Sequence, residues 1–183
     1  MIRSTRFLLA ALGATLALLP LSARAIVMQG LSLEELTRRA DLVVHGEVLA
    51  QSVRKEGKNL WTTTRLRVID TLKGSAPGAT LGFHQLGGSL DGRTVRIAGD
   101  ASFAPGEEVV VFLARTPEGL VLYGFSQGKF VVAFDPVANA PLVTRDLSEA
   151  TLVTPRGQAP ARQWAAPTLD DFRAEIRAFA NAR

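Results

Sequence analysis

The sequence predicts a mainly β protein: a small closed or partly open antiparallel barrel with a short N-terminal helix and a C-terminal amphipathic helix. Apolar and polar residues alternate with period two through residues 42–72, which is typical of half-buried strands. Short apolar runs separated by glycine-containing turns then continue to residue 135. Several short strands with frequent turns indicate a barrel or a sandwich.

The first 25 residues are expected to be a signal peptide. Arg3 and Arg6 precede an apolar run over residues 7–21, and Ala23-Arg24-Ala25 supplies the small residues that signal peptidase recognises. A membrane-spanning helix needs about 20 apolar residues, so this run is too short to be one. We expect cleavage after Ala25, a periplasmic or secreted protein, and no stable membrane anchor after cleavage.

Charge and cysteine content exclude several classes of partner. Without its first 25 residues the chain keeps 18 of its 21 basic residues against 17 acidic ones, a net charge of about +1. Such a balance gives no general field to attract nucleic acid or anionic lipid. The chain has no cysteine, which excludes disulfides and a lipidated N-terminal cysteine.

The predicted barrel domain covers residues 26–135 and opens on a short helix. Ser32 and Glu35 have the spacing of a capping box, and the helix is expected to end at about Ala40. A strand over residues 42–51 follows, in which Leu42 and Val44 share one face.

A second strand is expected over residues 60–72, after a polar turn. Leu66 and Leu72 fall on one side of it and Arg65 and Arg67 on the other, since strand side chains alternate. We expect the leucine side to face the core and the arginines to face solvent.

Five further strands are predicted, over the following ranges: 80–86, 94–98, 108–114, 120–125 and 129–135. Asp91-Gly92 is a strong two-residue hairpin signal before the second of these. The last three are apolar at nearly every position, so both of their faces are expected to be covered.

The last part of the chain divides into two segments. Residues 136–167 form an extension rich in proline and alanine, with room for one more strand near Leu142. Residues 168–183 are predicted to form a helix packed on the barrel, which Thr168 and Asp171 would open as a second capping box.

Gly124-Phe125-Ser126-Gln127-Gly128 matches the G-x-S-x-G motif of serine hydrolases. That motif needs a strand that turns into a helix, whereas residues 129–135 read as a strand. In those hydrolases the histidine follows the serine, but His45 and His84 both precede Ser126. We therefore interpret the motif as a hairpin loop between two strands, and we predict no catalytic residue.

A metal site is the other chemistry to consider. His45 and Glu47 lie on one strand face, with His84 as a third candidate ligand. One strand is expected to separate the two histidines, so we interpret all three as solvent-facing polar residues. We predict no metal and no cofactor.

Trp61, Arg65 and Arg67 suggest a basic, aromatic patch for single-stranded nucleic acid. Export and the near-neutral charge oppose this. A charged outer strand face explains the arginines, and we predict no nucleic-acid partner.

A series of turns and strand ends resembles a known group of sequences. The series consists of Ala40 to Val48, Thr64 to Gly74 with Leu72-Lys73-Gly74 at its end, Gly87-Gly88, Phe103 to Glu107 with Val111-Phe112-Leu113, and Gln127 to Phe130. It is similar to uncharacterised exported bacterial proteins and to netrin-like domains, which include the tissue inhibitors of metalloproteinases. The resemblance covers residues 31–135 and implies an OB-type barrel.

The resemblance does not extend to a mechanism. Inhibitors of that group depend on an N-terminal cysteine and on disulfides, whereas this chain has no cysteine and its mature form would begin at Ile26. We expect a non-enzymatic exported binding module that acts on an exported protease or an envelope protein. The alternatives are a small hydrolase that uses Ser126 or a metal at His45, and a purely structural envelope protein.

Overall fold

The protein is described by a computed structural model, which covers residues 26–147, 150–154, 157–158 and 166–182. The predicted signal peptide, residues 1–25, lies outside the described residues. Within them the protein is mainly β with two helices, α2 (Leu33–Arg39) and α3 (Leu169–Asn181). No helix of this part is both long and apolar enough to cross a membrane.

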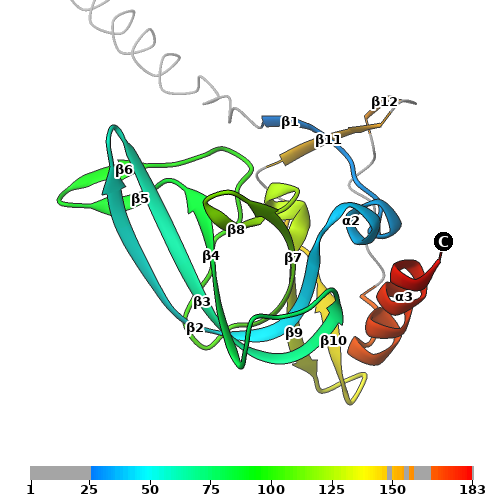
Figure 1. Cartoon of the computed structure of the whole chain (residues 1–183). Helices are drawn as coiled ribbons and strands as arrows, with labels where there is room; N and C mark the ends of the chain where they lie inside the picture. The colour runs from blue at the N-terminus through cyan, green and yellow to red at the C-terminus, as the bar shows by residue number, and fades with distance from the viewer. Residues whose placement is uncertain (1–25, 148–149, 155–156, 159–165, 183) are drawn as a thin grey trace, which may run out of the picture.

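Five strands pair into a ring (Figure 1). The ring runs from β7 to β2, β3, β4 and β8 and returns to β7. All of its pairs are antiparallel except β4–β8, which is parallel and joins His84 to Val121. The strands are β2 (Leu42–Glu56), β3 (Asn59–Lys73), β4 (Thr80–Leu86), β7 (Glu108–Thr116) and β8 (Gly119–Leu122).

Three groups of shorter elements surround the ring. β9 and β10 extend the sheet outward from β7, β5 and β6 form a separate hairpin, and β1 pairs in parallel with β11. Their bounds are β1 (Ile26–Gln29), β5 (Gly88–Leu90), β6 (Arg93–Val95), η1 (Phe125–Gly128), β9 (Lys129–Asp135), β10 (Ala140–Thr144), β11 (Ala150–Thr154) and β12 (Gly157–Gln158).

The predicted strands are confirmed, with changes in length. β4 and β9 have the predicted bounds, and β10 is the strand expected near Leu142. β2 and β3 are 15 residues each, because a tight turn at Gly57-Lys58 lets their pairing run to the tip of a long hairpin. The Asp91-Gly92 turn is also confirmed, with φ of 49° and 75°.

The ring separates two apolar clusters. The inner cluster fills the ring and includes Val44, Leu66 and Phe83. The outer cluster lies between the ring wall and the two helices, and includes Val43 and Phe112. β7 contributes to both clusters, which confirms that both of its faces are covered. β8 and β9 are covered less completely than predicted, and Phe134 at the end of β9 is 65% exposed.

The predicted position of Leu72 is wrong. Leu66 is buried in the inner cluster, but Leu72 is buried in the outer one. The β2–β3 register shifts at Ile69, which lies between them. This bulge adds one residue to β3 and so reverses which face the following side chains, including Leu72, point to.

Both helix caps are present, but only one is a capping box. At α2 the Glu35 amide donates to the Ser32 hydroxyl over 3.1 Å, and the Ser32 amide donates to the Glu35 carboxylate over 2.9 Å. At α3 the Asp171 amide donates to Thr168, but the Asp171 carboxylate accepts from the Thr168 hydroxyl instead of its amide. We attribute the difference to the side chain of aspartate, which is one methylene shorter than that of glutamate.

The Leu72-Lys73-Gly74 motif joins the ring to α2. Lys73 Nζ donates to the carbonyls of Thr37, Arg38 and Ala40 at 2.7 to 2.9 Å, which caps the C-terminus of the helix. Gly74 has a φ of 78°, and a Cβ there would lie 2.4 Å from the Asp41 carbonyl oxygen. The motif is thus explained by packing.

Candidate functional site

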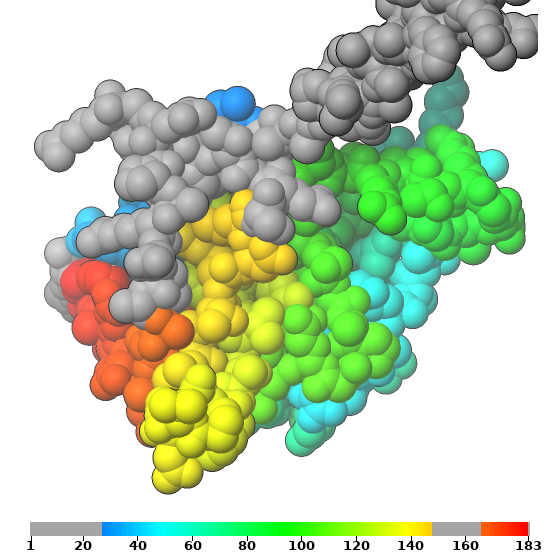
Figure 2. Space-filling model, turned by 180° about the vertical axis from the view of Figure 1, so that it is seen from behind, coloured from blue at the N-terminus to red at the C-terminus, as the bar shows by residue number. Residues whose placement is uncertain are grey.

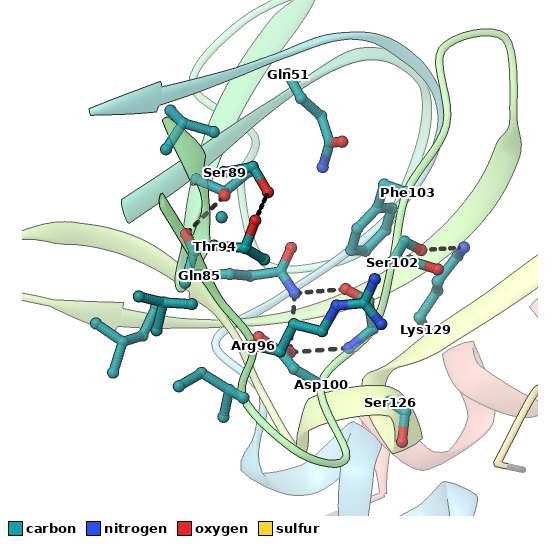
Figure 3. A pocket seen from close by; sticks show the side chains of 18 of the residues that line it. Gln51, Gln85, Ser89, Thr94, Arg96, Asp100, Ser102, Phe103, Ser126 and Lys129 are labelled. Carbon is teal, nitrogen blue, oxygen red and sulfur yellow. Dashed lines mark hydrogen bonds between the residues drawn. The ribbon is translucent and has the colours of Figure 1, made fainter. Parts of the chain in front are cut away.

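A cavity of about 780 Å³ opens beside the β5–β6 hairpin. Figures 1 and 2 show this hairpin on the opposite side of the molecule from α3. Its walls come from β2, β3, β4, β5, β6, β9, η1 and the segment of residues 96–107 (Figure 3). We call this cavity the polar cleft.

The polar cleft begins where the lining of β2, β3 and β4 changes from apolar to polar. Leu66 and Phe83 are fully buried in the inner cluster. Two residues beyond them, Thr64 and Gln85 are buried but polar, and Gln51 Nε2 donates to Thr64 Oγ1 over 2.9 Å. Because strand side chains on one face recur every second residue, this polar layer lies directly above the apolar core.

Gln85 and Asp100 hold one wall of the polar cleft. Gln85 Nε2 donates to Asp100 Oδ1 over 2.8 Å and to the Ala101 carbonyl over 2.9 Å, and the Ala101 amide donates to the same Asp100 oxygen. Burial raises the pKa of the Asp100 carboxyl, against the lowering effect of these two donors. The carboxylate is therefore an acceptor that fixes the loop.

Lys129 and Glu107 form a second fixed group. Lys129 Nζ lies 2.6 Å from Glu107 Oε1 and donates to the Ser102 carbonyl over 2.6 Å. It also lies 4.7 Å from the centre of the Phe103 ring, which packs edge-on against Phe83. This wall is continuous with the apolar core.

The paired glycines bring the β5–β6 hairpin close to the ring. Gly88 has a φ of 131°, and a Cβ there would lie 2.6 Å from Thr62 Oγ1 and 2.9 Å from Val53. Thr62 Oγ1 donates to the Gly87 carbonyl over 2.8 Å. The glycines therefore serve close packing and positive φ.

Ser126 lies at the polar cleft but does not sit on a nucleophile elbow. Its hydroxyl is buried and has no hydrogen-bond partner among the described residues. It belongs to the short 3₁₀ helix η1, which continues directly into β9. A Cβ at Gly128 would lie 1.8 Å from the Tyr123 carbonyl oxygen, so the second glycine of the motif is required by packing.

The predicted hairpin loop around Ser126 is wrong. β8 and β9 do not pair with each other, because both lie along β7: β8 pairs with residues 113–116 and β9 with residues 109–111. η1 carries the chain from the ring strand β8 to the outer strand β9. Neither histidine forms a hydrogen bond with Ser126 in the described part of the chain.

The predicted exposure of His45 is wrong. Its side chain is 2% exposed and lies under α3, where Nδ1 is 2.6 Å from Arg173 Nη2 and Nε2 is 2.6 Å from Glu108 Oε1. Since Arg173 can only donate, His45 Nδ1 accepts and its Nε2–H donates to Glu108. Burial lowers the pKa of His45 and the charge of Arg173 adds to this, whereas Glu108 opposes it. We call His45, Arg173 and Glu108 together the α3 seat.

The three candidate metal ligands do not meet. Both His45 nitrogens are engaged, Glu47 pairs with Arg67, and His84 Nδ1 lies 2.9 Å from Thr63 Oγ1. β3 separates the histidine strands, as predicted, and their partner positions on it are seven residues apart. At about 3.3 Å per residue this is roughly 23 Å. No cluster of three or more metal-ligating side chains occurs among the described residues.

Arg65 and Arg67 are exposed on the outside of β3, as predicted. Arg67 pairs with Glu47, which reduces the local positive charge. Trp61 is only partly exposed, opposite Arg54.

Comparison of the chain with protein-family models and with curated proteins gives no match.

The sequence did not indicate Gln51, Gln85, Asp100 or Lys129 as members of one site. They come from three strands and a loop that are brought together only by closure of the ring. One signal of this site was available in the sequence: Gln85 is polar, although it lies two positions after Phe83 and therefore on the same inward-facing side of β4.

Proposed function

We propose that the mature protein is an exported, non-enzymatic binding module that holds part of an exported protein partner in the polar cleft. The observation that carries this proposal is a cavity of about 780 Å³, within the roughly 300–1,000 Å³ typical of ligand sites, walled by fixed polar groups over an apolar core. The histidines, which general acid–base chemistry uses most, are engaged elsewhere.

We further propose that the ring is an OB-like barrel. Strands β2, β3 and β4 follow one another, and β7 returns after a long connection to pair with β2, which is the Greek-key order. β8 then lies between β7 and β4. A five-stranded Greek-key ring is the arrangement of OB folds, many of which bind extended ligands. This supports a binding role without identifying a ligand.

A pull-down that depends on the polar cleft tests the proposal. Mature protein carrying Thr94→Trp would fill the cleft from the exposed β6 position, and Thr80→Trp places the same side chain at an exposed position outside it. We expect wild type and Thr80→Trp to recover one stoichiometric partner from periplasmic or culture fluid of the host, and Thr94→Trp to recover none. Equal recovery by all three, or no partner under several conditions, contradicts the proposal.

A hydrolase is the second candidate, because the buried hydroxyl of Ser126, a residue that lines the polar cleft, has no hydrogen-bond partner among the described residues. Ser126→Ala tests it in a screen of ester and peptide substrates. A measured activity that Ser126→Ala abolishes would replace the binding proposal. A purely structural envelope role predicts neither a cleft-dependent partner nor an activity.

Export has its own test. The protein purified from its host should begin at or near Ile26 by intact mass, and residues 1–25 retained in the purified protein would contradict it.

A further inference from the structure

The charged groups that line the polar cleft differ in whether they already have partners. Asp100 accepts from Gln85, and Glu107 pairs with Lys129 and accepts from the Ala104 amide. Asp146 also has a partner. Arg96 is exposed and, among the described residues, it has neither an ion pair nor a hydrogen bond. The one charge that remains available to a ligand from this lining is therefore positive.

The rim beside the polar cleft is also positive. Residues 54–58 and 91–95, at the ends of the two hairpins, hold four basic and two acidic residues, an excess of +2 in a mature chain of about +1. Arg93 Nη2 donates to the Lys58 carbonyl over 3.2 Å, so the two hairpins lie side by side. All four basic side chains are exposed. A local field of this sign raises the rate at which anionic ligands arrive.

We infer that the polar cleft binds an acidic, extended peptide segment of the partner, with a carboxylate on Arg96. This inference rests on the proposed function and specifies its ligand. In Figure 3 the Arg96 side chain extends across the cavity, where its guanidinium can bind a carboxylate through two parallel hydrogen bonds.

Other groups of the polar cleft suit a peptide backbone. The Gln85 amide oxygen points into the cavity in Figure 3 and can accept from a peptide N–H, since its nitrogen already binds Asp100 and Ala101. Val53, Ile97 and Val131 add apolar surface for side chains.

The same lining disfavours a nucleic acid. A phosphate backbone carries a charge at every residue, and in the polar cleft it would approach Asp100, Glu107 and Asp146 as well as Arg96. An acidic peptide can space its carboxylates to avoid them. The favoured ligand therefore has separated carboxylates.

Fluorescence anisotropy of labelled probes on the mature protein tests this inference. The probes are a peptide of four Gly-Glu repeats, the matched peptide of four Gly-Lys repeats, and an eight-residue oligothymidylate. We expect only the glutamate peptide to bind, more weakly as salt is raised. Arg96→Glu and Arg96→Gln should each weaken this binding by about tenfold or more, as expected for loss of a charged hydrogen bond. Arg65→Glu, an exposed arginine outside the cavity, should change it less than about twofold.

Three results would overturn the inference: equal or tighter binding of the lysine peptide or the oligothymidylate, no binding of the glutamate peptide, or equal effects of the Arg96 and Arg65 variants. Partner recovery in the pull-down separates this failure from that of the proposed function. If Thr94→Trp abolishes recovery of the partner and Arg96→Glu does not, the polar cleft binds a partner but the acidic ligand is wrong.

Discussion

The α3 seat and the polar cleft both remove polar side chains from solvent, but they do so differently. In the α3 seat both nitrogens of His45 have partners at 2.6 Å, and Arg173 Nε, which has no hydrogen bond among the described residues, lies 3.7 Å from Asp70 Oδ2. In the polar cleft about 780 Å³ stays open, and Ser126 and Arg96 have no partner among the described residues.

The difference separates a structural use of polar groups from a functional one. A buried polar group that is fully hydrogen-bonded fixes one arrangement of the elements around it. One that is left unpaired costs stability, and this is expected where a ligand completes the site. The histidine, which sequence reasoning considered as a metal ligand, therefore belongs to the scaffold, and a glutamine and an arginine belong to the candidate site.

The largest effect should come from the apolar contacts of α3 with the outer cluster. Phe172 is fully buried, and its ring lies 4.8 Å from that of Phe130. Phe172→Ala should lower the free energy of unfolding by about 3 to 5 kcal/mol, measured by urea denaturation. The matched control is Phe134→Ala, because Phe134 is 65% exposed and should cost under about 1 kcal/mol. Similar losses would mean that α3 does not cover the outer cluster.

The packing of α3 shows how far the sequence could predict the fold. The sequence predicted an amphipathic helix over residues 168–183, and in α3 Leu169, Phe172 and Ile176 are buried and Phe179 is partly buried. The bulges of β3 could not be predicted, because the alternation of apolar and polar residues along one strand does not show where an extra residue is inserted. Leu72 was therefore assigned to the wrong face. His45 was assigned to solvent, because nothing near it in the sequence indicates that Arg173, 128 residues later, lies over it.

A smaller effect should come from the α3 seat. Arg173→Ala leaves His45 Nδ1 buried without a donor, which should lower the free energy of unfolding by roughly 1 to 3 kcal/mol. Arg177→Ala removes an ion pair with Asp70 from the same helix, but Arg177 is half exposed and the loss should stay below about 1 kcal/mol. A larger loss from Arg177→Ala would contradict a structural role of His45.

Acid should also weaken the α3 seat. The pKa of His45 is lowered in the folded state, so below the ordinary value of about 6.5 the unfolded chain binds a proton that the folded one does not. Stability is therefore lost as the pH falls from about 6.5 toward the lowered pKa. A protonated His45 would also place an N–H against the Arg173 guanidinium, with only Glu108 and Asp70 to offset the charge.

The measurement is the urea midpoint at pH 7.5 and at pH 5.5. We expect the decrease in wild type to be reduced in His45→Gln, which keeps an acceptor and a donor but does not titrate. An equal decrease in both proteins would mean that another group is responsible.

The site was less predictable than the fold. Strand alternation predicted correctly that Arg65 and Arg67 are exposed, because that depends on one strand alone. The polar cleft depends on where the segment of residues 96–107 lies relative to β4, and hydrogen bonds from Gln85 fix that position. Contacts between segments distant in sequence have no fixed residue spacing, so no sequence motif indicates them.

The smallest effect should come from Asp100, and its sign should be opposite to that of the α3 seat. Burial raises the pKa of Asp100, so the charged form is disfavoured in the folded state, and this loss is relieved as the pH falls toward the ordinary value of about 3.9. Asn has nearly the same shape, and its oxygen can still accept from Gln85 and from the Ala101 amide. Asp100→Asn should therefore raise the free energy of unfolding at pH 7 by about 0.5 to 1 kcal/mol, a gain typical of substitutions at sites that are not optimised for stability.

The control is Asp146→Asn, which removes a carboxylate from the same cavity lining. If Asp100→Asn instead destabilises the protein by more than about 1 kcal/mol, the Asp100 carboxylate is part of the scaffold, like His45, and the contrast between the two regions would not hold on that wall. A gain in stability combined with a change in glutamate-peptide affinity would place Asp100 on the functional side of the comparison.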